Sequence, residues 1–158
     1  AAQKSFERQK RYRLMWMDTK YEPGTLEVVA YDKEGNAVAE EEVHTAGKPH
    51  HIELSADRNQ LTADGKDLSF INVRVVDKNG NLCPDDTRQI QFKVRGAGAY
   101  RAAANGNSAS LELFHLPEMK LFSGQLTAIV QTAEEPGTIY FEASAPGVKG
   151  ATLELISK

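Results

Sequence analysis

The chain has 158 residues, a formal net charge of −3 and 41% hydrophobic residues. These proportions are typical of a globular protein and exclude the disordered and low-complexity classes. The mildly acidic charge argues against a dedicated nucleic-acid-binding protein, and no apolar run approaches the roughly 18 residues that a membrane-spanning helix needs. The single cysteine, Cys83, excludes an internal disulfide and a metal site made of several cysteines, and we expect its thiol to be buried or half-buried.

Apolar and polar residues alternate with period two along most of the chain, which predicts β-strands. In one such run, Ile90, Phe92 and Val94 fall on one face and Gln91 and Lys93 on the other. The same pattern predicts strands at residues 26–31, 37–43, 52–54, 71–76, 90–94, 139–143 and 151–156. Only residues 111–122 could hold a turn of helix, and Pro117 interrupts them.

The turn signals agree with this pattern. Segments 32–36 and 77–81 combine Asp, Asn and Gly directly after a predicted strand, and Pro-Gly pairs occur at residues 23–24, 136–137 and 146–147. Such residues supply the dihedral angles that tight turns between strands require. Frequent turns between short strands indicate an all-β fold, a sandwich or a barrel.

An internal echo indicates how the chain is divided. Glu-Pro-Gly-Thr occurs at residues 22–25 and again at 135–138, and each copy precedes two predicted strands. In a sandwich module of about 100 residues, these would be the last two strands. Only 21 residues precede the first copy. We therefore expect residues 1–46 to be the C-terminal part of a truncated module, which forms an incomplete sheet or self-associates, and residues 47–158 to be a complete module.

Several segments, in unchanged order, carry a resemblance to a known family. They are residues 13–16, 21–31, 45–47, 52–54, 56–58, 61–68, 73–81, 105–107, 122–124 and 128–131. The chain resembles the C-terminal part of bacterial β-galactosidases of glycoside hydrolase family 2. The resemblance implies immunoglobulin-like antiparallel β-sandwiches for both modules, 1–46 and 47–158. It also implies a non-catalytic accessory fragment of an exported, periplasmic enzyme that hydrolyses β-galactosides, with the catalytic barrel and the other domains of that enzyme as partners.

No catalytic residue is carried over from the family, because its two catalytic glutamates lie on a barrel that this sequence does not contain. We interpret the acidic pairs and runs at residues 40–42, 85–86 and 134–135 as solvated surface. The adjacent His50 and His51 would point to opposite faces of a strand and could not hold one metal ion together. We therefore expect no metal and no cofactor, and we expect this fragment not to be an enzyme.

The stretch from Gly96 to Gly124 is expected to be irregular, yet Phe114, Leu116, Leu121 and Phe122 are too apolar for a free loop. Together with Trp16, which we place at a module boundary, these four residues are our candidates for contact with a neighbouring domain. Two alternative functions stay open. A carbohydrate-binding module would need an exposed row of aromatic rings, and an adhesin-like surface domain is compatible with the fold alone.

Overall fold

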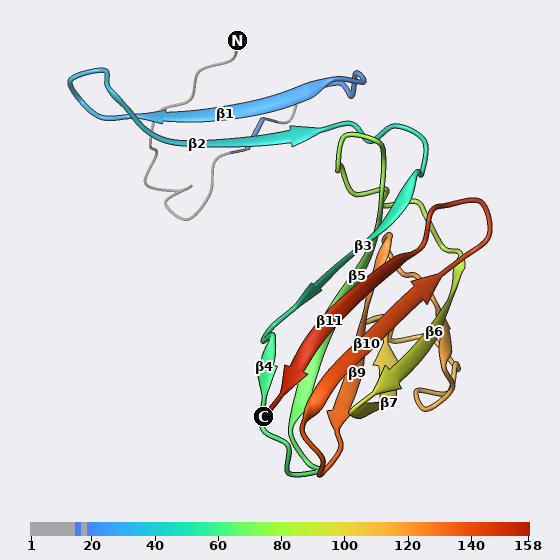
Figure 1. Cartoon of the computed structure of the whole chain (residues 1–158). Coiled ribbons are helices and arrows are strands. Elements are labelled where there is room, and N and C mark those ends of the chain that lie inside the picture. Colours follow the sequence, from blue (N-terminus) through green and yellow to red (C-terminus); the bar gives the residue numbers. More distant parts are fainter. Residues whose placement is uncertain (1–14, 17–18) are drawn as a thin grey trace. The chain divides into compact units, whose positions relative to one another are not determined.

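The computed structural model describes residues 15–16 and 19–158, and all of its regular elements are strands (Figure 1). They are β1 (Thr25–Tyr31), β2 (Ala37–His44), β3 (His51–Ala56), β4 (Gln60–Leu61), β5 (Leu68–Val76), β6 (Gln89–Gly96), β7 (Gly98–Ala104), β8 (Glu118–Lys120), β9 (Gln125–Thr132), β10 (Gly137–Ser144) and β11 (Ala151–Ser157). The chain divides into two compact units, Ala1–Thr45 and Ala46–Lys158. No helix that could cross a membrane occurs among the residues described.

The first unit contains the hairpin of β1 and β2, as the alternation predicts. Its strands pair in antiparallel register from Thr25 opposite His44 to Ala30 opposite Ala39. Nearly every residue of the hairpin is exposed within its unit. Residues 1–14 and 17–18 of the predicted first module lie outside the described part of the chain.

The second unit is a sandwich of two sheets. One sheet has the strand order β3-β5-β9-β7 and the other β4-β11-β10-β6-β8. The pairing is antiparallel except for the short β4, which lies parallel to β11. The order of the first sheet matches the A-B-E-D sheet of an immunoglobulin domain, and β6, β10 and β11 match its C, F and G strands. The predicted all-β, immunoglobulin-like sandwich is confirmed.

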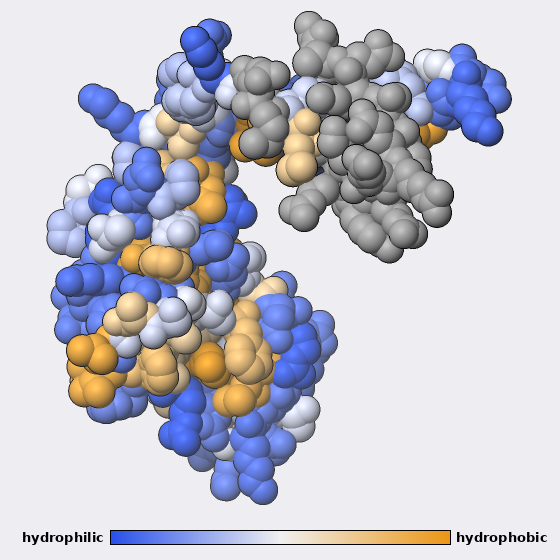
Figure 2. Space-filling model, turned by 180° about the vertical axis from the view of Figure 1, so that it is seen from behind, coloured by the Kyte–Doolittle hydropathy of each residue, from blue (hydrophilic) through white to orange (hydrophobic). Residues whose placement is uncertain are grey.

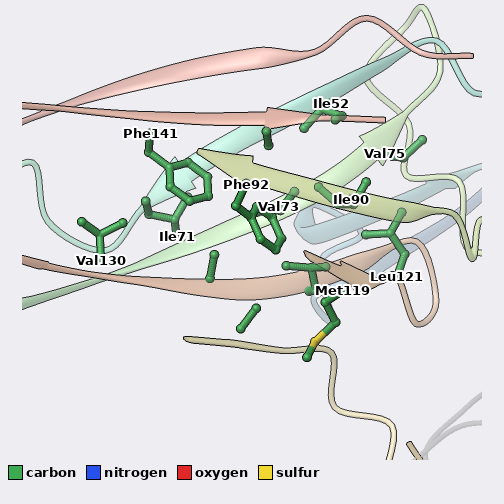
Figure 3. Packing of buried hydrophobic residues seen from close by; sticks show 14 of the residues in the cluster. Ile52, Ile71, Val73, Val75, Ile90, Phe92, Met119, Leu121, Val130 and Phe141 are labelled. Atoms are coloured by element: carbon green, nitrogen blue, oxygen red, sulfur yellow. The ribbon is translucent and has the colours of Figure 1, made fainter. Parts of the chain in front are cut away.

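Alternating side chains from both sheets form one core. Phe92 and Phe141 from one sheet face Ile71, Val73 and Val130 from the other (Figure 3). The Phe92 ring stacks between Phe141 and Tyr100, with centroids 5.7 and 5.6 Å away. Cys83 is also buried in this core, as expected. The unit therefore carries its own hydrophobic core.

Two hairpin turns with the pattern Asp-Lys-x-Gly-Asn share one geometry. In both the Asp N–H donates to the Asn carbonyl at 2.9 Å, and the Asn N–H donates back to the Asp carboxylate. Gly35 and Gly80 take φ values of 87° and 88°, which favour glycine. The turn residues therefore have the role that the sequence predicts for them.

The stretch expected to be irregular is more ordered than predicted. It contains β7 and β8, and only residues 105–117 between them form a long loop. No helical turn forms at residues 111–122, because β8 occupies residues 118–120 and pairs with β6. The chain passes from β6 in one sheet to β7 in the other through the single residue Ala97, a corner made by Gly96 at a φ of 89°.

Candidate functional site

The loop of residues 105–117 exposes a group of large apolar side chains. Leu111 is 95% exposed, Leu113 57%, Phe114 61% and Leu116 40%. We call these four residues the loop surface. Hydrophobic residues of the second unit gather at the surface on the face shown in Figure 2. A monomeric domain normally keeps such residues apart or covers them, so this loop is the first candidate for a functional surface.

Hydrogen bonds to β7 hold the backbone of this loop in place. The Ala103 N–H donates to the Phe114 carbonyl at 2.8 Å, as a further strand would do at the edge of the sheet. The Tyr100 hydroxyl shares its one hydrogen between the carbonyls of Phe114 and Leu116, at 3.2 and 2.7 Å. Burial raises the pKa of Tyr100 to about 12. The hydroxyl therefore stays protonated and keeps donating at physiological pH.

Three polar side chains of the loop, Asn105, Ser110 and Glu112, turn inward. The Glu112 carboxylate accepts the Lys120 N–H at 3.0 Å, the Ser110 hydroxyl at 3.3 Å and the Asn105 amide at 3.4 Å. The Asn105 amide also donates to the Lys120 carbonyl at 2.9 Å. Glu112 is half-buried, whereas its neighbours Leu111 and Leu113 are exposed. The sequence analysis missed Tyr100 and Glu112, although the alternation of residues 111–113 was a signal for this inversion.

The structure separates the five residues expected to contact a neighbouring domain. Phe114 and Leu116 both belong to the loop surface, and Phe122 is exposed in the turn between β8 and β9. Leu121 does not belong with them. It is buried in the core, because its side chain follows Met119 on the inward face. Trp16, half-buried, is part of the first unit.

The acidic residues show no arrangement suited to glycoside hydrolysis in the described part of the chain. Glu27, Glu40 and Glu42 place carboxylate oxygens within 4.8 Å of one another, but all three are exposed on the hairpin of the first unit. Glycosidases instead hold two carboxyl groups on either side of a bound sugar. Glu134 and Glu135 are exposed, as predicted.

Asp86, by contrast, is buried, so its interpretation as solvated surface was wrong. Its Oδ2 lies 2.7 Å from Nη2 of Arg88, and this ion pair makes the burial possible. Burial raises the pKa of Asp86, but the hydrogen bonds and the charge of Arg88 outweigh it and hold the pKa below the usual range. The pair is one wall of a pocket of about 630 Å³ that Gly47, Pro49 and Cys83 also line.

The Asp86 and Arg88 side chains of that pocket are already bonded to each other and to the backbone. Arg88 also donates to the Pro146 carbonyl at 2.7 Å. Burial, followed by the nearby carboxylates of Asp77 and Asp86, raises the pKa of the Cys83 thiol. A thiol of raised pKa is a poor nucleophile at neutral pH. Cys83, Asp86 and Arg88 therefore give this pocket no activated nucleophile.

His50 and His51 do not diverge as the alternation predicts. Their ring centroids lie 5.2 Å apart, and their Nδ1 atoms are within 3.0 Å. The reason is that β3 begins at His51, so His50 lies outside the pleated strand. Neither histidine belongs to a group of three possible metal ligands among the described residues.

One aromatic ring on the outer face of a sheet, that of Tyr140, is covered by a guanidinium. Tyr140 lies on the outer face of its sheet and is half-buried. The Arg95 guanidinium lies over its ring, 5.6 Å from the centroid. Arg95 also forms an ion pair with Glu142. Because the guanidinium occupies the ring face, Tyr140 does not offer a sugar-binding platform.

The comparisons with known proteins point to one family. Residues 52–154 match the family model described as "Glycoside hydrolase family 2 C-terminal domain 5". Residues 1–39 match a separate one, described as "Domain of unknown function (DUF4982)".

Among curated proteins, the β-galactosidase BoGH2A of Bacteroides ovatus is 43% identical over 136 residues, which are 86% of this chain and 16% of that protein. A β-glucuronidase of Formosa agariphila is 28% identical over 117 residues, 72% of this chain and 12% of that protein. A glycosyl hydrolase family 2 member from Bacteroides cellulosilyticus has a similar structure, with a TM-score of 0.88 and 30% identity. That match covers 94% of this chain and 20% of the solved one.

Proposed function

Because the chain belongs to the glycoside hydrolase family 2 C-terminal domain 5 family, we propose that it is a non-catalytic accessory domain of a β-galactosidase. The chain spans 16% of the length of the β-galactosidase that it matches. The observation that carries the proposal is the 43% identity over 86% of the chain to that enzyme, against 28% to the β-glucuronidase.

The chemistry of the described residues supports the non-catalytic part of the proposal. Hydrolysis of a glycoside needs one carboxylic acid to protonate the leaving oxygen and one carboxylate as nucleophile or base. The two buried aspartates of the second unit are engaged otherwise. Asp86 is paired with Arg88, and Asp77 accepts hydrogen bonds from three backbone N–H groups. Other domains of the parent enzyme, including its barrel, would supply the catalytic pair.

We also propose that residues 1–46 belong to a module of their own. The match of residues 1–39 to a separate family model and the division of the chain after Thr45 support this reading. That the module is truncated here, that it self-associates, and that the parent enzyme is exported to the periplasm all remain predictions.

The size of the native polypeptide tests the proposal first. An antibody raised against this chain should detect, in source cells, a product several times larger than 17.4 kDa. The purified product should hydrolyse a chromogenic β-galactoside faster than the matching β-glucuronide. A native product of 17.4 kDa would contradict the proposal. A preference for the glucuronide would indicate that the parent enzyme is a β-glucuronidase instead.

A further inference from the structure

We propose that the loop surface docks onto an apolar surface of another domain of the same polypeptide. This inference rests on the proposed function, because it needs a parent enzyme with further domains. It adds which residues make the contact and what kind of surface they meet. Its residues are Leu111, Leu113, Phe114 and Leu116, all carried by the loop of residues 105–117.

The side chains of this loop are oriented in the reverse of the usual way for a surface loop. A loop in water turns its polar side chains outward, but here Glu112, Asn105 and Ser110 bond to one another and to the backbone of β8. The apolar side chains are left in water. Exposing apolar groups is unfavourable by roughly 25 cal/mol per Å², so a partner that covers them gains free energy.

The loop is also held in shape before any partner binds. The hydrogen bonds from Ala103 and Tyr100 fix the carbonyls of Phe114 and Leu116 against the edge of β7. A segment that is already ordered loses little conformational entropy on binding. The order of the loop therefore favours a specific contact surface over a disordered apolar segment.

The size of the surface favours a tethered partner over a second copy. A large side chain offers about 200 Å², so the exposed fractions of the four residues sum to roughly 500 Å². A stable complex of free proteins buries about 800 Å² on each partner. A domain of the same chain acts at an effective concentration on the order of millimolar, so a smaller contact suffices.

The chemistry of the loop specifies an apolar partner. In residues 108–117 the formally charged side chain is Glu112, and its carboxylate is turned to Lys120, Ser110 and Asn105. The four side chains of the loop surface are themselves uncharged, so the contact that they make is apolar. Leucine and phenylalanine side chains fit an apolar surface of comparable size on a neighbouring domain.

Hydroxyl-radical labelling of the full-length polypeptide and of the isolated 158-residue chain tests the inference. We expect Leu111 and Phe114 to be labelled several-fold less in the full-length protein. Phe70, which is exposed on the outer face of β5, two strands away from β7 in the same sheet, serves as an internal reference. Equal labelling of the loop in both proteins would overturn the docking. Protection in the isolated chain that rises with its concentration, or that requires an added oligosaccharide, would also overturn it.

A pair of variants links protection to these residues. In the full-length protein L111S/F114S should raise labelling of Leu116 to the level of the isolated chain, whereas the matched control F70S should not. The single variant L111S, at the most exposed of the four positions, is used if the double variant does not fold. Hydrolysis of the chromogenic β-galactoside is measured on the same samples. An active enzyme with an unprotected loop disproves the docking alone, and an inactive one with a protected loop disproves the proposed function alone.

Discussion

One buried side chain, that of Asp77, holds several backbone segments of the second unit together. Its buried carboxylate accepts the N–H groups of Gly47 at 2.7 Å, Asn79 at 2.8 Å and Asn81 at 3.0 Å. These donors, with Gly47 first, outweigh burial and hold the pKa of Asp77 far below its usual range. The equivalent aspartate of the first unit, Asp32, accepts the same turn bonds from Asn36.

The depressed pKa predicts a specific acid dependence of stability. The stabilisation by ionised Asp77 is complete above the unfolded pKa of about 3.9 and is lost as the pH falls toward the lower folded pKa. At pH 7 we expect Asp77→Asn to melt at a lower temperature than the wild type, and this gap should shrink steadily below pH 4. Thermal unfolding from pH 7 to pH 2.5 measures it. Asp85→Asn, which changes an exposed carboxylate in the same unit, should show almost no gap at any pH.

Gly96 tests the corner between the two sheets. A Cβ at this position would lie 2.0 Å from the Thr138 carbonyl oxygen, and the φ of 89° already disfavours other residues. Gly80 has nearly the same φ, 88°, but open space around it. We expect Gly80→Ala to lower the free energy of unfolding by about 1 kcal/mol and Gly96→Ala by about 3 kcal/mol or more. Urea denaturation of the two variants distinguishes backbone strain, which both share, from the steric clash with Thr138, which only Gly96→Ala has. Equal losses of unfolding free energy in the two variants would contradict the clash.

At the level of elements, Tyr100 joins the loop surface to β7. Tyr100→Phe removes the hydrogen bond that the Phe114 and Leu116 carbonyls share, so we expect the free energy of unfolding to fall by about 1–2 kcal/mol. Exchange of the Ala103 amide, which bonds to the Phe114 carbonyl, should become roughly tenfold faster. Tyr140→Phe keeps its ring beneath Arg95 and is the control, with a change within about 0.5 kcal/mol. Unchanged exchange at Ala103 would show that the loop is held by other contacts.

Period-two alternation predicts a strand best where one face of the strand is buried and the other is exposed to solvent. Strands β5, β6 and β10 alternate clearly and were predicted for that reason. β7 was missed because its residues, GAYRAAA, are mostly small and give no strong alternation, and β9 was missed although its burial alternates. Alternation through Met119 and Leu121 was sufficient to place Leu121 in the core, but its neighbour Phe122 and the apolar loop before it obscured the pattern. The inward turn of Glu112 depends on hydrogen-bond partners at Asn105 and Lys120, which periodicity does not encode.

At the scale of the whole molecule, the second unit should unfold as one cooperative body because one core joins both sheets. Phe141, fully buried between them, anchors this core. We expect Phe141→Ala to lower the free energy of unfolding by about 3–5 kcal/mol. Phe70→Ala, on an exposed outer face, should change it by less than about 1 kcal/mol. Urea unfolding followed by circular dichroism and by amide exchange checks the cooperativity, and we expect the two transitions to coincide. Separate transitions for the two sheets would contradict it.

The role of the second unit in its parent is tested by removing residues 46–158 from the full-length polypeptide. If the unit is an accessory domain, the carboxylates that cleave the substrate lie elsewhere, and kcat on a chromogenic β-galactoside should stay within about tenfold. The melting temperature should fall, because an apolar surface that the loop covers becomes exposed to water. L111S/F114S in the intact protein should reproduce part of that fall without any loss of kcat. A collapse of kcat in a truncated enzyme that still folds would instead place residues of this unit in the catalytic machinery.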